Sequence, residues 1–169
     1  MEYHRYSCIP MLNRQGKYVG SITEGDLLWW LKGNHNLNLK LAEMERAGKL
    51  SAIVTQNIDG LHQAAGSKNV FELHGSVHRN YCQKCGKFFD VNYVVNAKGV
   101  PYCDECGGII KPDVVLYEEG LDSQTINGAV RAISKADMLI IGGTSLVVYP
   151  AAGMIDYFKG KYLAVLNRD

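Results

Sequence analysis

The chain has 169 residues, of which 47% are hydrophobic and 21% charged, with a formal net charge of +1. This is enough for one domain with its own core, and the near-neutral charge gives no electrostatic basis for binding nucleic acid or an anionic membrane surface. The apolar runs are shorter than the roughly 20 residues of a membrane helix, so we expect no membrane partner. The number of cysteines is odd, which does not favour a set of disulfides, and the sequence opens without a signal-like segment. We therefore expect a cytoplasmic protein.

The first 36 residues differ in character from the rest. Strand-like runs at residues 9–12 and 18–22 flank a polar turn and predict a hairpin. A helix is expected to follow, because Thr23 and Asp26 form a capping-box pattern before an apolar face. This order, in IPMLNRQGKYVGSITEGDLLWWL, resembles the closing half of a CBS domain. We assign residues 1–36 to a CBS-like half module and expect no nucleotide site in it, since paired modules form that cleft.

A polar joint at residues 34–38 marks a domain boundary, and from residue 37 onward helices alternate with strands. The helical spacing of Leu37, Leu41 and Met44 comes first, and a buried strand at 50–55 follows. Further along, the pattern predicts a helix at 123–135, a strand at 138–141, a helix at 151–158 and a strand at 162–166. The fold class expected for residues 37–169 is α/β, a partial Rossmann-like parallel sheet covered on both faces.

Four cysteines form two CxxC pairs, Cys82 with Cys85 and Cys103 with Cys106, and 17 residues separate the pairs. This spacing is typical of a zinc site. Four thiolates complete a tetrahedral shell without an open position, so the metal would be structural. The spacing leaves a four-thiolate iron site open as the alternative. We expect an inserted metal module over about residues 77–118.

Ligands of doubly wound sheets bind beyond the carboxyl ends of the strands. Three predicted strands end in polar residues, which are Gln56, Asn57 and Asp59, then Gly143, Thr144 and Ser145, then Asn167 and Arg168. A Gly-Thr-Ser turn can offer N–H groups and hydroxyls to ribose or phosphate oxygens. We therefore predict one ligand crevice at these strand ends.

Asn57 and Asp59 stand two residues apart in an apolar context. Together an amide and a carboxylate can bind a carboxamide, whereas an ordinary Asx-turn is the structural alternative. His74, at the end of VFELHG, is the best-placed general base, and His62 is its competitor. His78 is assigned to the surface or the metal module.

The segments TQNIDGLHQAAGSKNVFELHGSVHRNYC, KPDVVLYEE, IIGGTSLVVYPAA and LAVLN, in this order around the paired cysteines, resemble the bacterial sirtuins. These are NAD-dependent protein lysine deacylases, and the resemblance runs from about Leu41 to Asp169. It implies NAD and zinc as cofactors and an acyl-lysine protein or peptide as substrate. The products would be lysine, nicotinamide and O-acyl-ADP-ribose.

The resemblance also implies a role for each matching residue. His74 would be the base for the nicotinamide ribose hydroxyls, Asn57 would order the site and its water, Asp59 would hold the carboxamide, and Gln56 would face the ribose. Gly143, Thr144 and Ser145 would line the cofactor path, with Asn167 and Arg168 toward the adenosine. The acyl-lysine peptide would pair with main chain around Val114, Val115, Leu116, Tyr117, Leu146 and Val148. Cys82, Cys85, Cys103 and Cys106 would bind zinc.

Two departures from the family pattern concern the cofactor. The Gly-Ala-Gly-x-Ser loop, which cradles the dinucleotide phosphates, and the Pro-Asp-Phe-Arg run after it do not occur in these 169 residues. The sequence also ends at Asp169, before an expected last strand and helix. We expect a sirtuin truncated at both ends, joined to the CBS-like piece and impaired in catalysis. The alternative is an inactive zinc-binding fragment or chimera that binds at most a peptide or nucleotide.

Overall fold

The computed structural model describes residues 8–12, 18–23, 37–144, 147 and 149–166. The first elements are the antiparallel strands β1 (Cys8–Leu12) and β2 (Tyr18–Thr23), in which Ile9 lies opposite Ile22. The predicted hairpin is therefore confirmed. The helix expected after it lies outside the described residues.

Two parallel strand pairs form the centre of the molecule. Strand β3 (Ile53–Thr55) pairs with β4 (Val70–Glu72), and β8 (Met138–Gly142) pairs with β9 (Tyr162–Leu166). The predicted parallel pairing is confirmed, and β9 has the predicted bounds. The strand predicted at 50–55 is shorter, because its partner β4 offers only three residues for pairing.

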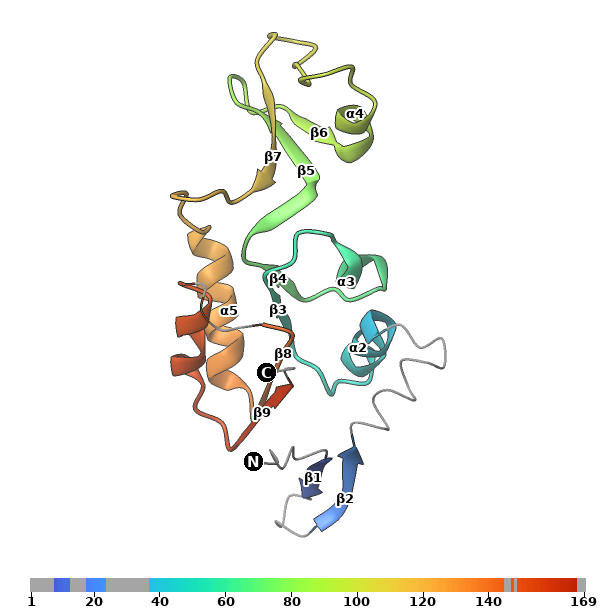
Figure 1. Cartoon of the computed structure of the whole chain (residues 1–169), viewed down its shortest axis with the longest axis vertical. Coiled ribbons are helices and arrows are strands. Elements are labelled where there is room, and N and C mark those ends of the chain that lie inside the picture. Colours follow the sequence, from blue (N-terminus) through green and yellow to red (C-terminus); the bar gives the residue numbers. More distant parts are fainter. Residues whose placement is uncertain (1–7, 13–17, 24–36, 145–146, 148, 167–169) are drawn as a thin grey trace, which may run out of the picture.

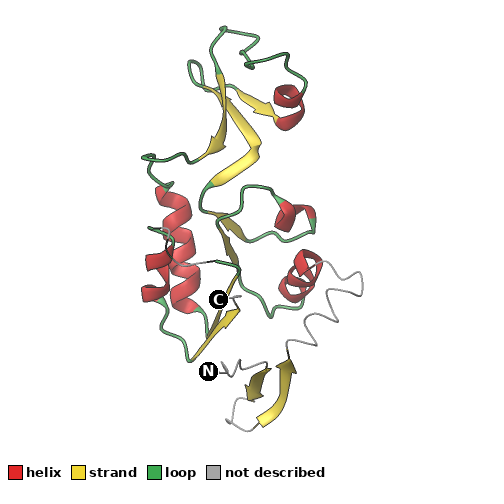
Figure 2. Cartoon of the chain, viewed as in Figure 1, coloured by secondary structure: helices red, strands yellow, loops and turns green. Residues whose placement is uncertain are grey.

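Helices lie on two sides of these strands (Figures 1 and 2). On one side are α5 (Ser123–Lys135) and the 3₁₀ helix η1 (Ala152–Tyr157), and on the other are α2 (Leu37–Arg46) and the short α3 (Leu61–Ala64). The prediction for α5 is confirmed in full. The helix predicted at 151–158 is present as a 3₁₀ helix, with bonds from the Gly153 amide to the Pro150 carbonyl and from the Met154 amide to the Ala151 carbonyl. Short helical pieces of this kind commonly take that tighter form.

The main core lies between α5, η1 and β4. Its buried members are Leu73, Ala129, Ile133, Ala151 and Met154. Gly128 lets α5 approach β4, because a Cβ there would overlap the Phe71 ring. The helix begins at its Asp122 cap, whose side chain accepts a hydrogen bond of 2.7 Å from the Thr125 amide.

Among the described residues, no helix has the length and apolar character needed to cross a membrane.

A separate antiparallel sheet occupies one end of the molecule, at the top of Figure 1. Its strand order is β6 (Phe88–Asp90), β5 (Gly75–Cys82) and β7 (Ile110–Val114), and α4 (Val91–Val95) follows β6. A second small core of Cys82, Phe89, Cys103 and Ile110 fills it. This unit is the inserted module expected from the paired cysteines, and it begins directly after His74.

Gly75 is the joint between the two parts. Its φ is +77°, and a Cβ at this position would overlap the backbone carbonyl of Asp113 on β7. Backbone atoms cannot move aside as a flexible side chain can. Only glycine therefore allows β5 and β7 to pair directly beside His74.

We predict that Gly75→Ala lowers the free energy of unfolding by at least about 2 kcal/mol, because backbone strain and overlap add. Gly48→Ala is the matched control, since Gly48 has a φ of +66° but nothing within 4 Å of the added Cβ. Gly48→Ala should lower the free energy of unfolding by the backbone strain alone, about 1 kcal/mol. Urea unfolding of both variants measures the difference. Equal losses would contradict the role assigned to the contact with Asp113.

Candidate active site and metal centre

The loop after β3 and the two residues after β4, Leu73 and His74, meet at one edge of the parallel pair. The pairing continues beyond the strands, since the Leu73 amide donates to the Thr55 carbonyl at 2.9 Å. An open hollow of about 450 Å³ lies at this edge. It is lined by Gln56, Asn57, Ile58, Asp59, His74, Val114 and Val115. The structure thus places the predicted base, the predicted carboxamide-binding pair and part of the predicted peptide segment around one space.

His74 is half-buried, and its Nδ1 lies 3.1 Å from the Gln56 carbonyl oxygen. A carbonyl only accepts hydrogen bonds, so Nδ1 carries the proton in this contact. In the neutral ring the lone pair then lies on Nε2, the nitrogen that can accept a proton from a ligand. His62 does not line the hollow, and its Nδ1 is buried without a hydrogen-bond partner among the described residues.

The turn that carries Asn57 and Asp59 is held by local hydrogen bonds. The Asn57 amide donates to Thr55 Oγ1 at 3.1 Å, and Asp59 Oδ1 accepts from the Leu61 amide at 3.0 Å. The Asx-turn alternative is therefore present, and it uses one carboxylate oxygen. Both side chains are exposed, and Asp59 Oδ2 has no protein donor among the described residues. A turn of this kind leaves that oxygen for a ligand.

Hydrogen bonds link the ends of β3, β8 and β9, although Gly143 and Thr144 do not line the hollow. Gln56 Nε2 lies 3.4 Å from Thr144 Oγ1, which links the loop after β3 to the loop after β8. The Gly143 amide donates to the Leu166 carbonyl at 3.1 Å, and its φ of +63° turns the chain away from β8. The predicted site residues Ser145, Leu146, Val148, Asn167 and Arg168 lie outside the described residues.

The segment after β7 borders the same hollow. The Val115 amide donates to the His74 carbonyl at 3.1 Å, and Leu116 and Tyr117 follow with exposed side chains. Sequence reasoning missed the residue that orders this segment. Glu119 Oε2 accepts from the Leu116 amide at 2.9 Å and from Lys111 Nζ at 3.1 Å. The backbone bond from Leu116 and then the Lys111 ammonium hold the pKa of Glu119 below its ordinary value.

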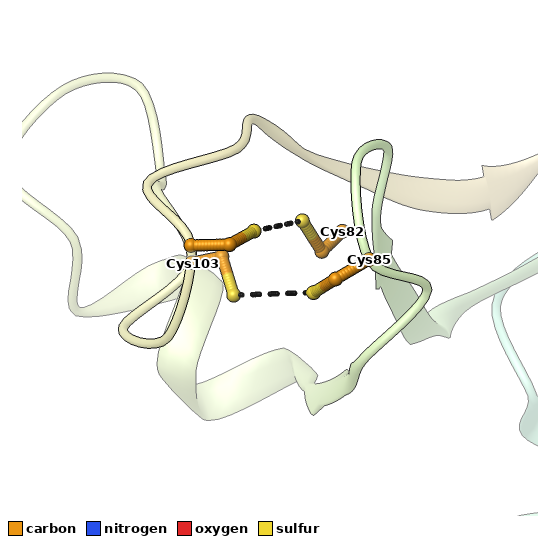
Figure 3. Close-up of side chains that lie close together, drawn as sticks. Cys82, Cys85 and Cys103 are labelled. Carbon is orange, nitrogen blue, oxygen red and sulfur yellow. Dashed lines mark hydrogen bonds between the residues drawn. The ribbon is translucent and has the colours of Figure 1, made fainter.

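The four cysteine sulfurs cluster in an arrangement that can hold a metal ion, and Figure 3 labels Cys82, Cys85 and Cys103. All Sγ atoms lie within 4.8 Å of one another, with 3.4 Å from Cys82 to Cys106 and 3.7 Å from Cys85 to Cys103. A tetrahedron with metal–sulfur bonds of about 2.3 Å has edges of about 3.8 Å, so the cluster fits a single zinc ion. The Cys85 amide, which donates to the Cys82 sulfur, contributes most to lowering the pKa of that thiol to about 6.

An ion pair fastens the two cysteine loops to each other. Lys87 Nζ lies 2.7 Å from Asp104 Oδ1 and 2.9 Å from Glu105 Oε1. Lys87 follows the first CxxC pair, and both carboxylates lie within the second. These contacts raise the pKa of Lys87, with Asp104 the larger cause. This ion pair is a second link between the two loops, in addition to the cysteine cluster.

These features define an α/β domain with a four-thiolate metal module inserted beside a ligand hollow. The sequence profile of the Sir2 family matches residues 11–150, so the chain belongs to the Sir2 family. This match begins within the segment assigned above to a CBS-like half module.

Two bacterial relatives illustrate the similarity. The chain is 68% identical over 129 residues to an NAD-dependent protein deacetylase of Clostridium acetobutylicum, a match that covers 76% of this chain and 53% of the relative. It is 57% identical over 129 residues to one of Cutibacterium acnes, with coverages of 76% and 52%. The chain therefore spans about half the length of the curated relatives it matches.

Solved Sir2 structures show the same fold. One is described as Sir2 with a p53 peptide and NAD⁺, with a TM-score of 0.71 and 36% identity over 85% of this chain and 66% of that chain. Another, described as Sir2 bound to acetylated peptide, has a TM-score of 0.70 and 37% identity over the same shares.

We predict that the purified chain binds one zinc ion and that the double variant Cys82→Ser with Cys85→Ser binds none. Because metal binding and local folding are one equilibrium, residues 75–114 should become protease-sensitive in this variant. Metal analysis and limited proteolysis measure both effects. Cys8→Ser, which changes the fifth cysteine outside the cluster, is the control and should behave as wild type. Unchanged protease resistance in the double variant would contradict a structural metal.

Proposed function

We propose that residues 37–169 form a large part of the catalytic domain of an NAD-dependent protein lysine deacylase. One observation carries this proposal, namely the contact between His74 Nδ1 and the Gln56 carbonyl, which leaves Nε2 as a base beside the hollow. The relatives named as NAD-dependent protein deacetylases and the Sir2 structures with NAD⁺ and acetylated peptide support it. The products of the reaction would be the free lysine, nicotinamide and O-acyl-ADP-ribose.

Each residue around the hollow has a proposed task. Bound NAD would supply the anomeric carbon that the acyl oxygen attacks and nicotinamide as the leaving group. Asp59 and Asn57 would bind the carboxamide, since Asp59 has an open carboxylate oxygen and both side chains are exposed. His74 would accept a proton from a ribose hydroxyl at Nε2. Gln56, Gly143 and Thr144 would face the ribose and phosphates.

The remaining predicted site residues complete this proposal. The peptide would lie along Val114, Val115, Leu116 and Tyr117, where the Val115 amide already bonds to the His74 carbonyl. Ser145, Leu146, Val148, Asn167 and Arg168 would contribute from the segments outside the described residues. Zinc would hold the module that begins after His74. Four cysteines without disulfides suit the reducing cytoplasm, where we place the protein.

The 169-residue chain on its own would be a weak enzyme. Its sequence has no Gly-Ala-Gly-x-Ser loop, and the CBS-like half module that we propose for residues 1–36 offers no replacement for a phosphate-binding loop. Binding energy for the dinucleotide phosphates would then be lost, and with it the alignment of the reacting atoms. An inactive zinc-binding fragment that binds peptide is the limiting case of the same proposal.

A chimera tests the function directly. Residues 41–169 would replace the matched region of the Clostridium acetobutylicum deacetylase, with the rest of that protein kept on both sides. We predict that the chimera deacetylates an acetyl-lysine peptide with NAD, and that the 169-residue chain does so at least about 100-fold more slowly. Nicotinamide release is the measurement. An inactive but folded chimera would contradict the proposed function.

His74→Ala in this chimera should lower the rate by about 100-fold or more, because a general base contributes on that scale. His62→Ala is the matched control and should leave the rate nearly unchanged, since His62 does not line the hollow. An equal loss of deacetylation rate in both variants would contradict the assignment of His74 as the base.

A further inference from the structure

Strand β5 contains a bulge directly beyond the site. Ser76 lies opposite Asp113 on β7, but the next pair is Asn80 with Pro112, so residues 77–79 have no partners on β7. Bulges redirect side chains and backbone groups and are common next to active sites. Asn80, only 1% exposed, stabilises the bulge through a bond of 3.2 Å from its Nδ2 to the Val77 carbonyl.

All three bulge residues contact elements near the hollow. The Val77 amide donates to the Ile58 carbonyl at 3.1 Å, and His78 Nε2 lies 2.9 Å from the Asp59 carbonyl oxygen. Arg79 joins Glu72 on β4 and Asp113 on β7, at 2.7 and 2.8 Å. Val77 and His78 therefore contact the turn that carries Asn57 and Asp59 in place of pairing with β7, while Arg79 still pairs with Asp90 on β6.

The His78 ring lies against the turn as well as bonding to it. Gly60 has a φ of +67°, and a Cβ there would lie 2.7 Å from His78 Cδ2. The side chain is exposed, so it contributes little as part of a core. Since the Asp59 carbonyl only accepts, Nε2 must donate in this contact.

We propose that His78 is a positioning residue that holds the turn of residues 57–60 in the geometry that a carboxamide ligand requires. The carboxamide ligand in this inference rests on the proposed function, whereas the contact between His78 and the Asp59 carbonyl does not depend on it. His78 acts through the Asp59 backbone and does not touch the hollow. With Val77 it makes two neighbouring attachments between the metal module and the turn, which couple the position of Asp59 to the fold of that module.

Two substitutions separate hydrogen bonding from packing. His78→Gln keeps an N–H donor at about the reach of Nε2, whereas His78→Leu fills similar space without a donor. Lys98→Leu changes another exposed basic side chain of the same module and is the control. Zinc content and thermal unfolding of the full 169-residue chain verify that each variant is folded.

The first readout is amide hydrogen exchange of Leu61, whose N–H bonds to Asp59 Oδ1. We expect His78→Leu to speed this exchange about five- to tenfold, as for the loss of one hydrogen bond, while His78→Gln and Lys98→Leu remain close to wild type. Unchanged exchange in His78→Leu, or equal acceleration in His78→Gln, would overturn the proposal.

The second readout is the affinity for nicotinamide, measured by NMR titration. We expect His78→Leu to raise the Kd about five- to tenfold and His78→Gln to restore it, with zinc content unchanged. Wild-type binding in His78→Leu would count against positioning. If the wild-type chain binds no nicotinamide, the proposed function is weakened, while the exchange rates still decide the role of His78.

Discussion

The parallel pairing of β3 with β4 is the contact on which the site depends. It involves only three residues of each strand and continues in the bond from the Leu73 amide to the Thr55 carbonyl. Because parallel strands end at the same edge, this register sets the Gln56 carbonyl against His74 Nδ1. A slip of one residue would turn His74 to the other face of the pair and remove that contact.

The metal module is joined to this edge within a single residue. His74 ends the polypeptide segment after β4, and Gly75 begins β5 with a conformation that brings β7 beside it. The cysteines thus contribute to the site at a distance. They stabilise the metal module, which contains β5 and β7. Strand β5 contains the bulge, and the end of β7 with the residue after it places Val114 and Val115 at the hollow.

Much of this arrangement could be predicted from the sequence, where the pattern was local. Helix α5 and strand β9 have the predicted bounds, because a continuous apolar periodicity specified each of them. The cysteine cluster followed from spacing alone, and Gln56, Asn57 and Asp59 of the hollow followed from the polar end of a predicted strand. Val114 and Val115 came from the resemblance to the sirtuins.

Other features depend on tertiary contacts that no local pattern encodes. The length of β3 is set by β4, and the predicted helix at 151–158 takes the 3₁₀ form of η1. The bulge in β5 comes from its contacts with another segment, so His78 was assigned by sequence only to the surface or the metal module. Glu119 was also missed, although its partners, the Leu116 amide and Lys111, lie close to it in the sequence.

The protonation pattern of the His74 ring can be measured without catalytic activity, because it depends only on the register of β3 and β4. ¹⁵N NMR of the imidazole at about pH 9, where histidine is ordinarily neutral, distinguishes the two ring nitrogens. The register of β3 and β4 predicts a proton on Nδ1 and a bare Nε2. A neutral ring protonated on Nε2, with Nδ1 bare, would contradict it.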